Sequence, residues 1–424
     1  MQWPATHHEF TRFLYRLRHQ QRDALIVTYE SNSQAQQTDS QATDPYAEIR
    51  PYNDDEVAEV IARLANDPEL LDALTQYRLP RLRRYAPRLA RGIASLAIRR
   101  EMRGVNSVRD FQMRLASYMH RMIRSTTDAF EVEGLDRLDP DTAYLFIGNH
   151  RDIALDPAFV NYALYQAGRN TVRIAIGDNL LQKPYVTDLM RLNKSFIVPR
   201  SARGKRAMLA AFQALSSYIR HSIIGDNHSI WLAQREGRAK DGIDRADTAI
   251  VKMLTMARRQ ADKTADFGEA IEELRMVPIS ISYEYDPCDL QKARELHAMH
   301  TEGRYQKVEF EDIRSIVAGI TGNKGRIKLS FGSPLDRIFD TPDAVAAEID
   351  RQVLGGYHLF PSHMLALEAT GLAPDLLDLS EVTDVDRARF SARLAEIPTH
   401  LHDWWLAQYA NPVLNRAGRL TEER

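Results

Sequence analysis

The chain has 424 residues, enough for one large domain with additions or for two or three domains. Its 56 Lys and Arg and 58 Asp and Glu nearly cancel, which argues against a protein that is basic throughout, and we expect no nucleic-acid partner. The single cysteine, Cys288, excludes an intramolecular disulfide and is typical of a reducing compartment.

The sequence contains no candidate membrane span. No apolar run approaches the roughly 18–20 residues that a span requires. The N-terminal residues also have no uninterrupted apolar segment followed by small residues, as a signal peptide would have. We therefore expect a cytoplasmic protein that could still bind a membrane surface.

Residues 1–49 are expected to form a short N-terminal segment and a linker. Residues 31–44 are polar, rich in Gln and Ser and aperiodic, which predicts flexibility. Helical patterns then run to about residue 124. Apolar residues recur at i, i+3, i+4 and i+7 from Val57 onward, and Asp67 followed by a proline is typical of a helix start.

The predicted helical domain at residues 50–127 has an uneven charge distribution. Between Arg78 and Arg124 there are thirteen arginines and two acidic residues, Glu101 and Asp110. An apolar stripe lies among these arginines and consists of Leu82, Leu89, Ile93 and Leu96. Two interpretations stay open. The surface either docks on anionic membranes or acidic partners, or is a solvated face whose charge is balanced by acids elsewhere.

From about residue 128 the pattern changes to strands that alternate with helices. The predicted strands are residues 143–148, 172–177, 195–198, 229–233, 276–282 and 326–331. Helical patterns separate most of them, notably residues 203–221 and 245–261. This alternation indicates an α/β fold with a mixed, mostly parallel sheet and flanking helices. We place this domain at residues 128–340 and a helical C-terminal extension at residues 341–424.

The stretch GNHRDIALDP, from Gly148 to Pro157, follows the first predicted strand and carries an Asn, a His and two Asp. A metal site is one interpretation, because His150, Asp152 and Asp156 could supply nitrogen and oxygen ligands. Metallophosphatases, however, place an Asp-x-His and a Gly-Asp element before such a stretch, whereas the candidates here come after it. We therefore expect no metal.

Two further interpretations of this stretch involve a helix cap and acid–base chemistry. Asn149 or Asp152 could cap the following helix, which leaves His150 unexplained. Alternatively, an aspartate holds His150 so that its ring can take a proton from an alcohol. No Ser or Cys lies in a Gly-x-Ser-x-Gly type of elbow, so the nucleophile would be the substrate's own hydroxyl.

Four blocks in order resemble the glycerolipid acyltransferases, a family that contains glycerol-3-phosphate and lysophosphatidate acyltransferases. The blocks are NHRDIALDP from Asn149, FIVPRSARGKR from Phe196, LAQREGRAKDG from Leu232 and MVPISISYE from Met276. The resemblance covers about residues 128–335. The stretch that begins at Gly168 and the Asp-Pro-Ala after the first block are also similar to the soluble, plastid type of glycerol-3-phosphate acyltransferase, which has a small helical domain before its α/β domain.

The resemblance implies direct acyl transfer in phospholipid biosynthesis. His150 would be the general base on a hydroxyl of glycerol-3-phosphate, and the donor would be a thioester of acyl carrier protein or coenzyme A. The spacing departs from the family, because five residues and not four separate His150 from Asp156. Either the extra residue loops out and Asp156 orients His150, or Asp152 does so. The Asp-Pro-Ala continuation favours Asp156.

The resemblance also implies cations that bind the phosphate of the acceptor. The aligned residues are Arg200 and Lys205 in the second block and Arg238 and Lys240 in the third. Glu236 could order the loop by pairing with one of these arginines, backbone N–H groups near Gly237 could stabilise an oxyanion, and Asn149 would shape the turn. No cofactor is implied. The basic helices would meet an anionic membrane, at its inner face, or an acidic acyl carrier protein.

Two alternatives remain open. The acceptor could instead be 1-acylglycerol-3-phosphate (lysophosphatidate), which would require a groove for its acyl chain. The altered His–Asp spacing also leaves room for a catalytically inactive, membrane-binding relative of the enzymes.

Overall fold

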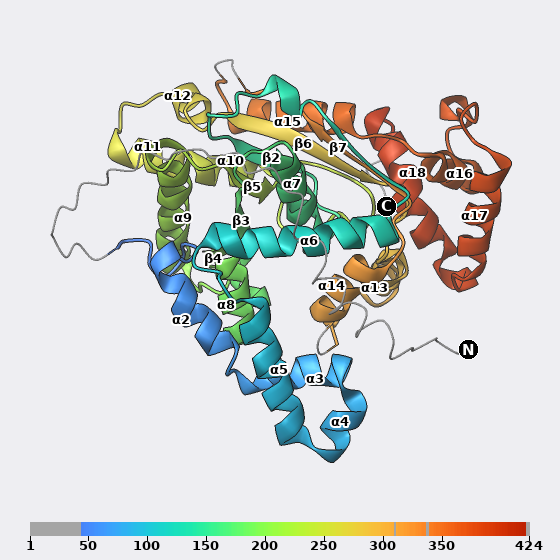
Figure 1. Ribbon diagram of the computed structural model, residues 1–424. Coiled ribbons are helices and arrows are strands. Elements are labelled where there is room, and N and C mark those ends of the chain that lie inside the picture. The colour runs from blue at the N-terminus through green and yellow to red at the C-terminus, as the bar shows by residue number, and fades with distance from the viewer. Residues whose placement is uncertain (1–43, 309–310, 336–338, 421–424) are drawn as a thin grey trace. The chain divides into compact units, whose positions relative to one another are not determined.

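The computed structural model describes residues 44–308, 311–335 and 339–420. The sequence predictions for residues up to 43 lie outside this part of the chain. Residues Pro45–Arg424 form one unit that contains a seven-stranded sheet (Figure 1). Its strands are β1 (Ala129–Glu133), β2 (Leu145–Gly148), β3 (Arg173–Gly177), β4 (Ser195–Val198), β5 (Ile230–Ala233), β6 (Met276–Tyr283) and β7 (Arg326–Phe331).

Neighbouring strands follow the order β1-β7-β6-β2-β5-β3-β4. Strands β2 to β6 are mutually parallel, because β2 pairs with β5 and β6 while β3 pairs with β4 and β5. Strand β7 is antiparallel to β6, and β1 is parallel to β7. The predicted mixed, mostly parallel sheet is confirmed. The carboxyl ends of β2 to β6 meet at one edge, which is where open α/β sheets bind ligands.

The six strands expected from the sequence are all present, with ends that differ by at most two residues. Strand β1 was not expected. Its Phe130 and Val132 alternate with glutamates, and none of its residues is fully buried. This alternation is the signal that could have identified an edge strand with one apolar face.

The α-helices of the described residues separate and flank these strands. They are α2 (Val57–Leu64), α3 (Pro68–Arg78), α4 (Pro80–Tyr85), α5 (Pro87–Glu101), α6 (Val108–Thr126), α7 (Leu155–Gln166), α8 (Pro184–Leu192), α9 (Lys205–Arg220), α10 (Thr248–Leu254), α11 (Met256–Ala261), α12 (Phe267–Glu272), α13 (Asp289–Glu302), α14 (Glu311–Thr321), α15 (Pro342–Gly356), α16 (Pro361–Thr370), α17 (Asp384–Ala395) and α18 (His402–Arg416). The single helical pattern predicted at 245–261 is divided between α10 and α11, and α13 and α14 were not expected.

Helices cover both faces of the sheet (Figure 1). Along β2, Phe146 belongs to an apolar core shared with α6 and α7, whereas Leu145 and Ile147 belong to a second core shared with α9, α10 and α15. Successive side chains of a strand point to opposite faces, so a strand covered on both sides is apolar throughout. This explains the unbroken apolar run that precedes the His–Asp stretch.

Helix α3 begins as the sequence predicts, whereas the next two helices, α4 and α5, bury few apolar side chains. Asp67 caps α3 by accepting the N–H of Leu70. In α4 no residue is buried, and in α5 only Ala90 is. The apolar stripe is correspondingly exposed, with Leu89 at 58% and Leu96 at 68% of full exposure.

The C-terminal helices pack around their own apolar cluster. Helix α15 begins at the predicted cap, where Thr341 accepts the N–H of Ala344. Helices α16, α17 and α18 then enclose the fully buried Trp405. None of the helices in the described ranges has both the length and the apolar character needed to cross a bilayer.

Candidate active site

The candidate site lies at the carboxyl edge of the sheet, on the loops that follow β2 and β5. The two strands are adjacent and parallel, with Gly148 opposite Ala233. A Cβ atom at Gly148 would lie 2.6 Å from Cγ1 of Ile279 on β6, so the strand end requires glycine. Beyond it, the carbonyl of His150 accepts the N–H of Ala239 at 2.8 Å. The first and third sequence blocks therefore lie side by side.

His150 and Asp156 form a hydrogen-bonded pair. Nδ1 of His150 lies 2.7 Å from Oδ2 of Asp156, and a carboxylate oxygen can only accept, so Nδ1 donates. The same Oδ2 accepts the backbone N–H groups of Arg151 at 2.6 Å and Asp152 at 2.9 Å. Asp156 is buried, whereas the His150 side chain keeps 16% of its exposure. The aspartate favoured by the Asp-Pro-Ala continuation is the one that bonds to His150.

Asp152 caps the helix instead. Its Oδ1 accepts the N–H groups of Ala154 at 2.9 Å and Leu155 at 2.8 Å, at the start of α7. Burial and the neighbouring charge of Asp156 raise the pKa of Asp152 to about 6. Asp152 thus satisfies the first N–H groups of α7 from two residues before the N-cap position, Ala154, as the cap interpretation expected of it.

Asn149 ties the loop to the central strand β6. Its Oδ1 accepts the N–H of Ile281 at 2.8 Å, and its Nδ2 donates to the Ile281 carbonyl at 3.0 Å and to Asp244 Oδ2 at 3.2 Å. Asn149 is buried and does not cap α7. These contacts are what a residue that shapes the turn would make.

A buried ion pair between Arg151 and Asp244 joins the two loops, and the sequence analysis missed it. Nη2 of Arg151 lies 2.6 Å from Oδ2 of Asp244, and its guanidinium also donates to the carbonyls of Ala239 and Gly242, each at 3.2 Å. Both side chains are buried. The two residues are 93 positions apart, so no local pattern in the sequence signals the pair.

Helices α13 and α18 support these loops from outside. On α18, Asn411 and Asn415 donate to the carbonyls of Asp241 and Asp244 at 2.8 and 2.9 Å. On α13, Lys292 donates to the carbonyl of Arg151 at 2.7 Å. The C-terminal extension thus contacts the loop of the third block directly.

The four predicted phosphate-binding cations have different surroundings. Arg200 pairs with Glu236 at 3.4 Å, as we expected for Glu236. Lys240 forms an ion pair with Glu295 of α13. Arg238 makes no ion pair or hydrogen bond with any described residue. Burial by itself would raise the pKa of the nearby Asp286, but the charge of Lys292 and, less strongly, that of Arg238 lower it below its usual value. Lys205 is exposed at the start of α9.

Gly237 has a φ of 79°, a left-handed conformation that favours glycine. Its predicted part in an oxyanion site stays a prediction.

Burial, followed by the charge of Asp286, raises the pKa of Cys288 to about 12, which disfavours the thiolate form that a nucleophile requires. Within the described ranges, no three His, Cys, Asp or Glu side chains are grouped so that they could hold a metal ion.

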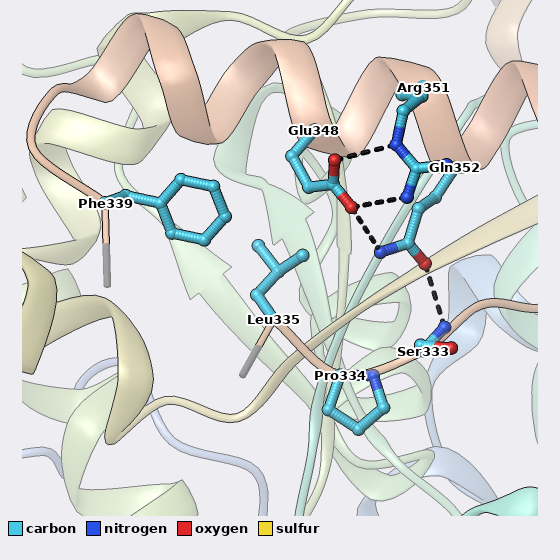
Figure 2. A pocket seen from close by; sticks show the side chains of 7 residues that line it. All are labelled: Ser333, Pro334, Leu335, Phe339, Glu348, Arg351 and Gln352. Atoms are coloured by element: carbon cyan, nitrogen blue, oxygen red, sulfur yellow. Dashed lines mark hydrogen bonds and ion pairs between the residues drawn. The ribbon is translucent and has the colours of Figure 1, made fainter. Parts of the chain in front are cut away.

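A hollow of about 380 Å³ lies elsewhere, between the segment after β7 and helix α15 (Figure 2). Leu335, which lines it, donates its N–H to the carbonyl of Met276 at the first residue of β6. The pair of His150 and Asp156 lies at the opposite end of β6, near Tyr283. The hollow is therefore at the other edge of the sheet and contains none of the predicted site residues.

Residues 129–231 match the family model described as Acyltransferase. The predicted resemblance to acyltransferases is confirmed. The matched segment runs from β1 into β5 and contains His150, Asp156 and Arg200, whereas Arg238 and Lys240 lie beyond it.

No protein in a search of the curated proteins matches the chain. A solved structure that matches is that of the 1-acyl-sn-glycerophosphate (LPA) acyltransferase PlsC from Thermotoga maritima, at 13% identity over 58% of this chain and 78% of that chain. The TM-score is 0.32.

Proposed function

We propose that the chain is an O-acyltransferase that moves a fatty acyl group from an acyl thioester to a hydroxyl of glycerol-3-phosphate in phospholipid biosynthesis. The thioester would be carried by acyl carrier protein or coenzyme A. The observation that carries this proposal is the hydrogen-bonded pair of His150 and Asp156 at the carboxyl edge of the sheet, within the segment that matches acyltransferases.

The arrangement suits direct attack by the acceptor. Asp156 holds the Nδ1–H of His150, which leaves Nε2 as the basic nitrogen. The acceptor hydroxyl gives its proton to Nε2, its oxygen bonds to the thioester carbonyl carbon, and the C–S bond breaks. The proton then passes from His150 to the departing thiolate. General-base catalysis contributes roughly 10²–10⁴-fold, and positioning and oxyanion stabilisation must supply the rest.

The acceptor phosphate would bind to cations on the loops after β4 and β5. Arg238 is the best placed, because it flanks Ala239, which bonds to the His150 carbonyl, and no described carboxylate pairs with it. Arginine binds phosphate through two parallel N–H groups. Arg200 could also bind the phosphate after releasing Glu236, whereas Lys240 would first have to break its ion pair with Glu295. We assign Arg238 the main part in binding the phosphate and give a lesser part to Lys205, which is exposed at the start of α9.

We further propose that α4 and α5 rest on an anionic lipid surface. Apolar side chains of these helices are exposed, and Arg84 and Arg88 lie among them without an ion pair to any described residue. The alternative of internal charge balance holds for Arg91 and Arg83, which both lie near Asp72, at 2.6 and 3.9 Å. Exposed apolar side chains amid arginines suit a lipid interface, which has both an apolar and an anionic layer.

The experiment that tests the activity is acyl transfer by the purified chain. Glycerol-3-phosphate and lysophosphatidate are offered separately, each with acyl carrier protein and coenzyme A thioesters. Activity should be lost in His150→Ala, fall strongly in Asp156→Asn and survive in Asp152→Asn, because the His150 ring bonds to Asp156, whereas Asp152 bonds to the start of α7. Product from lysophosphatidate alone would replace the proposed acceptor. No product with any pair of substrates, from folded protein, would refute the proposal.

A further inference from the structure

We infer that Tyr283 is a positioning residue that fixes the Asp156 carboxylate and thereby sets the basicity of His150. The inference rests on the proposed function for its catalytic consequence, although the hydrogen bond itself does not. The Tyr283 hydroxyl donates to Oδ1 of Asp156 at 2.7 Å. It is a side chain from a strand 127 positions away, and the sequence analysis did not select it.

The sheet brings Tyr283 beneath the site. In the register of β2 and β6, Gly148 lies opposite Ile279, so β6 continues four residues past the end of β2. Tyr283 is the last of them and is 4% exposed. Its ring packs edge-on against Phe159 of α7, with 6.1 Å between ring centroids. The ring therefore contacts the helix that carries Asp156.

The two oxygens of Asp156 have different partners. Oδ2 accepts three N–H groups, from the His150 ring and from the backbone of Arg151 and Asp152. Oδ1 accepts the hydroxyl of Tyr283. With donors on one oxygen alone, the carboxylate plane could turn about that oxygen. The hydroxyl on the other side holds the plane, so Oδ2 stays aligned with Nδ1 of His150.

The hydroxyl is a permanent donor. Burial, followed by the charges of Asp156 and Asp152, raises the pKa of Tyr283 well above its usual value. It therefore keeps its proton at any pH at which the protein would work.

The other charges around the pair differ in their partners. Asp152, which follows His150 in the chain, faces α14, and the charge of Lys324 beyond that helix reaches it. Asp286, after β6, pairs with Lys292 of α13. Arg151 pairs with Asp244. Among the described residues, the side chains that hydrogen-bond to Asp156 are thus the His150 ring and the Tyr283 hydroxyl.

The direction in which removal of the Tyr283 hydroxyl shifts the pH–rate profile can be predicted. Oδ1 would be buried without a donor, and the carboxylate would become more basic. A more basic partner at Nδ1–H stabilises the protonated ring of His150, so the ring would hold its proton to higher pH. The acidic limb of the pH–rate profile would move to higher pH, and kcat would fall because the ring is less well oriented. KM would change little, since the buried Tyr283 acts through Asp156.

The test compares Tyr283→Phe with Tyr285→Phe. Both positions are buried tyrosines, Tyr283 at the end of β6 and Tyr285 two residues beyond it, but Tyr285 packs on Tyr409 in the C-terminal cluster. The titration midpoint of the His150 ring, followed by NMR, should rise by about half a unit or more in Tyr283→Phe and stay unchanged in Tyr285→Phe. The kcat should fall about tenfold in Tyr283→Phe, with KM within about twofold. An unchanged midpoint and kcat in folded Tyr283→Phe would overturn the inference.

Two further arms keep the test decisive. If Tyr283 acts through Asp156, adding Tyr283→Phe to Asp156→Asn should cost little more than Asp156→Asn alone, whereas fully additive losses would contradict the inference. If Tyr283→Phe does not fold, 3-fluorotyrosine at position 283 keeps the ring and strengthens the donor. The midpoint should then fall, and a rise or no change would count against the inference. The NMR arms need no acyl transfer, so failure of the proposed function is recognised separately.

Discussion

Gly319 of α14 lies directly against the carboxylate of Asp152: a Cβ atom at position 319 would stand 2.2 Å from Oδ2. Asp152 in turn caps α7, the helix that carries Asp156. A single close contact therefore connects α14 to the loop of the candidate site.

We expect Gly319→Ala to destabilise the protein and lower its activity. Alanine inside a helix normally stabilises by up to about 1 kcal/mol relative to glycine. Here the added methyl group would push Asp152 and the His150 loop from their positions. Gly92→Ala is the matched control, because Gly92 lies inside α5 and, apart from its chain neighbours and the backbone of its own helix, no atom lies within 4 Å of its Cβ position. Urea unfolding should show a gain for Gly92→Ala and a loss for Gly319→Ala; equal gains would contradict the close contact.

Asp152 should make the protein less stable as the pH rises. Its pKa is about 6 in the folded chain and near 4 when unfolded, so between these values the folded state holds a proton that the unfolded state has lost. Stability then falls as pH increases from about 4 to 6, by about 2–3 kcal/mol for this group. Asp152→Asn keeps an oxygen for the cap and removes the titration. The variant should lose less unfolding free energy over this range than the parent chain, and parallel pH curves would refute the assignment.

The environments of Arg238 and Lys240 predict different effects on acceptor binding. Arg238→Gln should raise KM for glycerol-3-phosphate by roughly tenfold to a hundredfold, because a charged hydrogen bond to phosphate is lost. Lys240→Gln should change KM less than about threefold, because Lys240 is committed to Glu295. The comparison is made by steady-state kinetics at fixed donor concentration. A larger effect at Lys240 would show that the ion pair opens to bind the substrate.

Membrane docking through α4 and α5 predicts a specific loss of binding. Leu89→Glu with Leu96→Glu should weaken binding to vesicles that contain anionic phospholipid by tenfold or more, because two apolar contacts are lost and two like charges are added. Binding of the parent chain should also decrease with added salt. Val385→Glu, at a side chain 76% exposed on α17, is the control. Equal binding of all three proteins would exclude this surface.

The sequence alone determined most of what depends on local order along the chain. Strand positions follow from apolar runs, and the caps at Asp67 and Thr341 follow from the residues next to them. Asp156 was preferred over Asp152 from the Asp-Pro-Ala continuation, and the hydrogen bond goes to Asp156. The strands and the caps depend on neighbours within a few positions, where periodicity and capping act, whereas the preference for Asp156 came from the resemblance to acyltransferases.

Only the tertiary structure decided which distant groups meet. Three contacts join residues that are far apart in the chain. They are the ion pair of Arg151 with Asp244, the ion pair of Lys240 with Glu295 and the hydrogen bond from Tyr283 to Asp156, which span 93, 55 and 127 positions. Burial removes these groups from water, so each must find a partner wherever the fold places one. The strand order of the sheet determines those partners, and no single stretch of the chain determines the strand order.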